Sequence, residues 1–125
     1  MRGNTEKDVF KRRPYQFTLD LIKFTEGLPK DRVVDVIVKQ LIRCGTSVCA
    51  NYVEAYAASS KRDYANFFSY SLKSANESKF WNSLLRDTGK ADKEDAQVLL
   101  DDELDQISRI LGSSLITLRR KDAKN

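Results

Sequence analysis

The sequence contains no histidine, and its 125 residues include only two cysteines, five glycines and two prolines. Without histidine, the chain cannot form a Ser-His or Cys-His nucleophile pair, supply an imidazole general base or build the usual catalytic zinc site. It also lacks a CxxC pair and a glycine-rich phosphate-binding motif. We therefore expect a protein that is not an enzyme and that holds no cofactor or metal.

The two cysteines, Cys44 and Cys49, fall in a stretch whose periodicity predicts a helix. On a helix they are about 140° apart, on different faces, so they cannot form a disulfide with each other. We interpret them as small packing residues, and a reactive thiol is the alternative.

No run of about 18 apolar residues occurs, and the first residues contain no apolar segment of the secretory kind. We therefore expect a cytoplasmic protein. Apolar residues make up 41% of the chain and charged residues 32%, a balance typical of a soluble helical protein. The length suits a single domain, residues 1–125, that buries its own core.

Apolar periodicity and chain breaks predict four helices, at about residues 14–27, 31–58, 61–88 and 93–121, with flexible N- and C-terminal tails. Pro14 suits the first turn of the first helix, Ser59 or Ser60 suits the N-cap of the third, and Gly89 suits its end. Short turns between long helices favour an all-α fold, an up-down-up-down four-helix bundle.

Each predicted helix carries one apolar stripe at helical spacing. The expected core positions are Phe17, Leu21, Phe24 and Leu28, then Val34, Val38, Leu41, Gly45, Val48, Tyr52 and Ala55, then Tyr64, Phe67, Phe68, Leu72, Ala75 and Leu85, and finally Leu100, Leu104, Ile107, Leu111, Leu115 and Leu118. Gly45 is unusual among them, since a glycine on a core face lets a neighbouring helix approach closely.

The second and third helices also carry a second apolar stripe. Its members are Ile42, Cys49, Val53 and Tyr56 on one helix, and Tyr70, Ser74, Glu77, Trp81 and Leu84 on the other. Large exposed apolar patches usually mark interaction surfaces, so these stripes predict a homo-oligomer. A wide core that buries both stripes is the alternative.

A polar stripe runs along the second helix through Arg43, Ser47, Asn51 and Glu54. One interpretation pairs Glu54 with Glu77 as acid/base carboxylates or hard-metal ligands. The other interpretation is structural: Arg43 pairs with Glu54 or Glu77, within a subunit or between subunits, and joins the second and third helices.

The net charge of +4 becomes more informative once the topology is considered. In an up-down-up-down bundle, three parts of the chain lie at the same end. They are the start of the first helix, the turn between the second and third helices, and the end of the fourth helix. The cations expected there are Lys11, Arg12, Arg13, Lys61, Arg62, Arg119, Arg120 and Lys121. Such an end suits binding of RNA or DNA by phosphate neutralisation, with Tyr15, Tyr56 and Tyr64 near enough to stack on bases. The alternatives are helix-end electrostatics and an acidic protein partner.

Four segments together resemble one known family: "QLIRCGTSVCANYVEA", "SKRDYANFF", "SLKSANESKFWNSLLRDTG" and "ISRILGSSLITLRR". They are similar, in this order, to a family of bacterial four-helix-bundle proteins first noticed in intervening sequences of large-subunit (23S) rRNA genes. The resemblance covers about residues 12–120. Cys44 and Cys49 depart from it, because many members have a serine and a glycine there.

The resemblance implies a cytoplasmic four-helix bundle that assembles as a ring-shaped homopentamer and has no known enzymatic activity. A distant relative is the accessory protein of diversity-generating retroelements, a basic pentamer that associates with nucleic acid. The recurrent polar and aromatic positions of the family correspond here to Arg43, Thr46, Ser47, Asn51, Glu54, Glu77 and Trp81. Most members have no established function, so a non-enzymatic nucleic-acid-binding protein and a protein-protein interaction scaffold both remain open.

Overall fold

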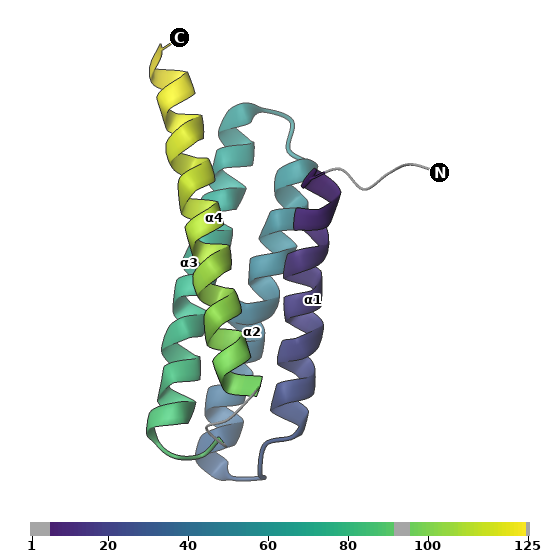
Figure 1. Cartoon of the computed structure of the whole chain (residues 1–125), viewed down its shortest axis with the longest axis vertical. Coiled ribbons are helices and arrows are strands. Elements are labelled where there is room, and N and C mark those ends of the chain that lie inside the picture. Colours follow the sequence, from purple (N-terminus) through teal and green to yellow (C-terminus); the bar gives the residue numbers. More distant parts are fainter. Residues whose placement is uncertain (1–5, 92–95, 125) are drawn as a thin grey trace, which may run out of the picture.

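The computed structural model describes residues 6–91 and 96–124, with side chains for residues 12–91 and 100–121. It contains four helices: α1 (Glu6–Glu26), α2 (Arg32–Tyr56), α3 (Lys61–Asp87) and α4 (Ala96–Lys124). They alternate in direction along one axis, so the chain forms an up-down-up-down bundle (Figure 1). The described residues contain no strand, and none of their helices is long and apolar enough to cross a membrane. The all-α prediction is confirmed.

Local signals in the sequence set most helix boundaries. Asp31 caps α2, because its carboxylate accepts hydrogen bonds from the Val33 and Val34 amides at 2.7 and 3.3 Å. Ser60 caps α3 by accepting from the Asp63 amide at 3.1 Å. Gly89 follows α3 with a positive φ of 70°, a conformation that glycine adopts without steric cost.

The predicted start of the first helix was wrong. Helix α1 begins at Glu6, so residues predicted as a tail are helical and Pro14 lies inside the helix. The missing proline N–H leaves one carbonyl of the preceding turn without its usual helical donor. The Pro14 ring is fully buried, and this packing helps to offset that loss. Helix α4 likewise extends past the predicted end, to Lys124, whereas its predicted start at residue 93 and the remaining tail residues, 1–5 and 125, lie outside the described residues.

Helices α2 and α4 bury most of the stripes expected of them. Ile37 and Cys44 join the buried face of α2, and Val38 is only partly buried. Along α4, Leu100, Leu104, Ile107, Leu111 and Leu115 are buried, and Leu118 is half-buried. Gly45 makes the close approach expected of it, because a Cβ at this position would overlap Cδ2 of Leu21 on α1.

The core face of α3 is more polar than predicted. Phe68, Ala75 and Leu85 are buried as expected, but the positions between them are filled by Ser71, Ser78 and Asn82. Each of these three side chains has a hydrogen-bonding partner, so it can be buried without a large loss of free energy. The predicted core residues Tyr64, Phe67 and Leu72 pack only partly against the core.

The second stripes are divided between core and surface. Trp81, Leu84 and Tyr56 pack partly against the core, as the wide-core alternative expected. Tyr70 and Val53 are 48% and 57% exposed, and Val36 and Phe80 are also exposed. Helices α2 and α3 therefore keep apolar side chains on the outside of the bundle.

Candidate functional site

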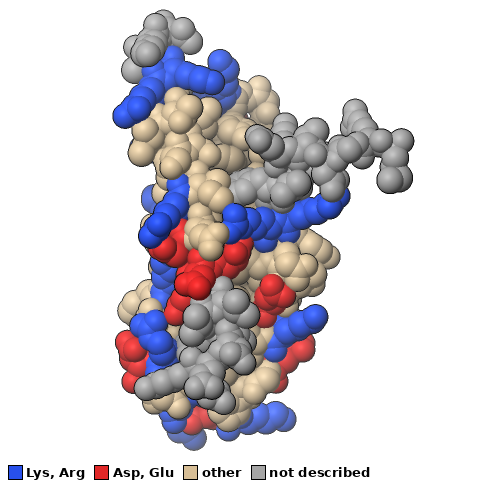
Figure 2. Space-filling view, in the orientation of Figure 1, with Lys and Arg blue, Asp and Glu red and all other residues tan. Residues whose placement is uncertain are grey.

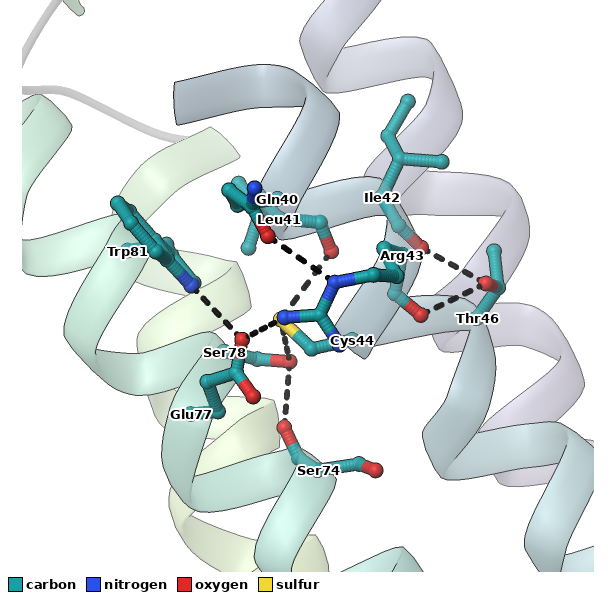
Figure 3. Close-up of polar contacts among 10 residues, drawn as sticks. All are labelled: Gln40, Leu41, Ile42, Arg43, Cys44, Thr46, Ser74, Glu77, Ser78 and Trp81. Carbon is teal, nitrogen blue, oxygen red and sulfur yellow. Dashed lines mark hydrogen bonds and ion pairs between the residues drawn. The ribbon is translucent and has the colours of Figure 1, made fainter. Parts of the chain in front are cut away.

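The polar stripe of α2 forms one network with α3 through Arg43 (Figure 3). The Arg43 guanidinium forms an ion pair with the Glu77 carboxylate, and its Nε donates to Gln40 Oε1 at 3.0 Å. Glu77 Oε2 also accepts from Trp81 Nε1 at 3.0 Å. This contact lies within one chain and partly faces solvent, so it joins α2 to α3 and orients the Trp81 ring.

The rest of that stripe does not join this network. Asn51 Nδ2 donates to the Ser47 carbonyl and hydroxyl oxygens, both at 2.9 Å, so these two residues satisfy each other within α2. Glu54 is exposed and lies about 16 Å along α2 from Arg43, the residue that contacts Glu77. Glu54 and Glu77 are therefore too far apart to act together as acid and base or to share a metal ion. No group of three potential metal ligands occurs among the residues that the structure describes.

Both cysteines fit the packing interpretation. Cys44 is buried, and its sulfur accepts a hydrogen bond from the Ser78 hydroxyl at 3.2 Å. Burial raises the pKa of the Cys44 thiol and that of the half-buried Cys49 thiol. A raised pKa keeps both sulfurs protonated at neutral pH and makes them poor nucleophiles.

The predicted basic end divides into two parts. Lys79 contacts Asp105 at 3.4 Å, and α3 and α4 are antiparallel. Along α3, Lys61 lies about 27 Å before Lys79, and along α4, Lys121 lies about 24 Å after Asp105. The start of α3 and the end of α4 are therefore level with each other. We call their five cations the α3/α4 tip: Lys61, Arg62, Arg119, Arg120 and Lys121.

All five side chains of the α3/α4 tip are exposed, and no ion pair links them to another described residue. Figure 2 shows Lys and Arg side chains where α4 finishes, and acidic side chains across the middle of the same face. Asp63 is the one described carboxylate in the first turn of α3. The tip is thus a local excess of positive charge in contact with solvent.

Arg13 does not belong to the tip. Its Nη2 donates to Glu103 Oε2 at 3.2 Å, and it also contacts Gln106, so it joins α1 to the middle of α4. The hydrogen bond to Glu103 raises the pKa of Arg13. Glu103 lies about 24 Å along α4 from Arg119. The neighbouring Arg12 is exposed on α1, and the Lys11 side chain lies outside those described.

Sequence reasoning missed the polar contacts that Asp101 and Glu103 of α4 make with other helices. Asp101 accepts from Asn82 Nδ2 at 2.7 Å and from Arg86 Nη1 at 3.0 Å, and Glu103 accepts from Arg13. The spacing of Asn82 from the predicted core residues Ala75 and Leu85, seven residues before it and three after it, placed it on the core face of α3, which was a signal that it would need a buried partner. The identity of that partner depends on the pairing of helices.

A model of the 23S rRNA-intervening sequence protein family matches residues 6–113 of this four-helix chain. The chain belongs to this family. It is also similar to a crystal structure of a protein of unknown function from the S23 ribosomal protein family of Bacteroides thetaiotaomicron. The two chains are 30% identical with a TM-score of 0.77, over 84% of this chain and 96% of the other. No match was found among curated proteins.

Membership confirms the resemblance inferred from the sequence, but the function of the family is unknown. Neither comparison brings evidence of catalysis. The family model ends at residue 113, before Arg119, Arg120 and Lys121. Three of the five tip cations therefore lie in a part of α4 beyond the matched residues.

Proposed function

We propose that this protein is a non-enzymatic, cytoplasmic homo-oligomer that binds RNA or DNA through the α3/α4 tip. The observation that carries the proposal is the group of five exposed cations contributed by two helix ends. Lysine and arginine bind a phosphate backbone by neutralising its charge and releasing condensed counterions. The proposal includes no base-specific contact, so affinity should depend strongly on salt and weakly on sequence.

Assembly would multiply this charge. Apolar side chains lie exposed on the outer faces of α1, α2 and α3; they include Tyr15, Val36, Val53, Tyr70 and Phe80. Contact with further copies of the chain would remove these groups from water. The ring-shaped homopentamer that the family resemblance implies would place five tips on one face if its subunits are parallel. The mass of the particle in solution tests this part of the proposal directly.

Charge reversal at the tip tests nucleic-acid binding. We expect the triple variant Arg62→Glu/Arg120→Glu/Lys121→Glu to bind a labelled RNA and a labelled DNA much more weakly in fluorescence anisotropy. If the three cations each contact one phosphate, the slope of log K against log salt measured on B-form DNA becomes shallower by about 2.7.

The matched control reverses three exposed cations at the opposite end of the bundle, Lys23→Glu/Lys30→Glu/Arg32→Glu. It has the same net charge as the tip variant and should bind nearly as tightly as the unmodified protein. Equal loss in the two variants would mean that net charge, and not the tip, governs binding. Both variants should keep the native mass, since none of these six residues belongs to the exposed apolar groups.

A protein-protein scaffold without nucleic-acid binding is the second candidate. The exposed Val36, Tyr70 and Phe80 favour it, because apolar surface binds proteins more readily than phosphates. This candidate predicts that a defined protein partner co-purifies with the native complex and is retained after nuclease treatment. It also predicts that the tip variant keeps this partner.

A further inference from the structure

Among the side chains that the structure describes, the aromatic ones nearest to the α3/α4 tip are packed against one another. Tyr52 and Phe68 stack with ring centroids 5.4 Å apart, and Tyr64 lies 4.7 Å from Phe68. Tyr56 meets Tyr52 and Tyr64 edge-on, at 5.1 and 5.6 Å. These four residues, the aromatic cluster, join the end of α2 to the start of α3.

Hydrogen bonds hold the same rings in place. The hydroxyl oxygens of Tyr52 and Tyr56 are 2.8 Å apart, and Tyr64 also hydrogen-bonds to Tyr56. Burial, followed by the hydrogen bond to Tyr56, raises the pKa of both Tyr52 and Tyr64 far above that of a free tyrosine. Turning Tyr56 or Tyr64 outward would break these contacts and expose the buried Tyr52. The cluster is therefore part of the fold and is not a free platform for stacking.

Other exposed aromatic side chains are distant from the tip cations. Along α3, Phe80 lies about 28 Å from Lys61, and Tyr70 lies about 13 Å from it. Tyr15 is 62% exposed, but it lies on α1, near the Arg13 that contacts the middle of α4. Tyr64 directly follows the tip on α3, but its partly buried ring packs against Phe68 and Tyr56. Among the described residues 60–63 and 116–121, none is aromatic.

We propose that the α3/α4 tip selects double-stranded over single-stranded nucleic acid, because its described residues offer cations from two helix ends but no free ring on which an unpaired base could stack. This inference rests on the proposed function and narrows its ligand class. Proteins that hold single strands combine a basic groove with exposed aromatic side chains. A duplex keeps its bases stacked internally and carries about one negative charge per 1.7 Å of its axis, so charge alone can bind it.

Competition between strands of matched charge tests the inference with the full-length protein. The probes are a labelled 20-base-pair RNA duplex, the corresponding DNA duplex, and single strands that carry the same number of phosphates. We expect the duplexes to bind about tenfold or more tightly than the single strands at 100 mM salt. If both duplexes bind, the tip recognises paired backbones in general. If only one of them binds, the tip also distinguishes the RNA helix from the DNA helix.

Two results would overturn the inference while leaving the proposed function in place. One is a single strand that binds as tightly as the duplex. The other is loss of duplex binding in the variant Tyr15→Leu, which removes an exposed ring but keeps an apolar side chain, while the tip charges are intact. Failure of every probe to bind would instead reject the proposed function, and the inference with it.

Discussion

Helices α2 and α4 are both buried along one face, yet they are held by different contacts. Helix α2 is held mainly by close packing and neutral hydrogen bonds, for example the Ser71 hydroxyl donating to the Val48 carbonyl at 2.7 Å, and one ion pair, Arg43–Glu77, joins it to α3. Helix α4 adds charged groups at its edges, where Asp101, Glu103 and Asp105 meet side chains of α1 and α3. Shape therefore does more to fix the position of α2, whereas charge contributes more to the position of α4, which has three described ion pairs to other helices.

The largest expected effect comes from filling the two helical glycines on these helices. Gly45→Leu forces side-chain volume against Leu21 in a packed core, and we expect it to lower the free energy of unfolding by about 3 kcal/mol. A Cβ at Gly112 of α4 meets nothing within 4 Å, so Gly112→Ala should raise that free energy by about 0.5 to 1 kcal/mol. Urea unfolding followed by circular dichroism measures both. Destabilisation by Gly112→Ala would contradict the proposed difference between the helices.

A smaller difference is expected between two buried serines. Ser71→Ala removes the hydrogen bond to the α2 backbone, and we expect a loss of about 1 kcal/mol of stability. The buried Ser108 hydroxyl of α4 has no partner among the described atoms, so Ser108→Ala should be neutral or stabilising by up to about 1 kcal/mol. The same unfolding measurement compares them. A similar loss of stability in both variants would show that the Ser108 hydroxyl has a hydrogen-bond partner in solution.

The smallest effect concerns Asp31, which caps α2 and contacts Lys90 at 2.7 Å in the turn before α4. The hydrogen bond from Lys90, and then those from the Val33 and Val34 amides, hold the pKa of Asp31 below its ordinary value of 3.8. Because the folded state has the lower pKa, this carboxylate stabilises the protein above about pH 3.8 and ceases to do so as pH falls through the folded-state value.

Substituting Lys90→Met should raise the Asp31 pKa only part of the way to its ordinary value, because the two amide bonds remain. A carboxyl-carbon NMR titration of Asp31 in the folded protein measures the midpoint. The exposed Lys39→Met is the control and should leave that midpoint unchanged. An unchanged midpoint in Lys90→Met would mean that the contact does not persist in solution.

The predictability of each helix follows from how its buried positions are filled. The leucines and isoleucine of α4 repeat at helical spacing, so sequence alone identifies its core face. On α3, Ser71, Ser78 and Asn82 occupy core positions, and only the facing helices supply the partners that make their burial acceptable. Pro14 misled the prediction of the first boundary, because burial of its ring depends on tertiary packing.

The sequence also predicted part of each candidate site. Helical geometry and family resemblance pointed to Arg43, Glu77 and Trp81, and these residues contact one another. The basic end was predicted from topology, and five of its cations gather at one tip. Arg13 could not be separated from them beforehand, because its partner Glu103 is 90 residues away in the chain.

The first turn of α1 and the last turn of α4 lie at the same end of the bundle as the tip (Figure 1). An affinity tag or fluorescent fusion attached to either terminus would therefore extend from the end of the molecule at which a nucleic acid is proposed to bind. A polyhistidine tag could itself compete for anions or shield the lysines and arginines. Labels inserted in the turn between α1 and α2, at the opposite end, would leave that surface open for measurement.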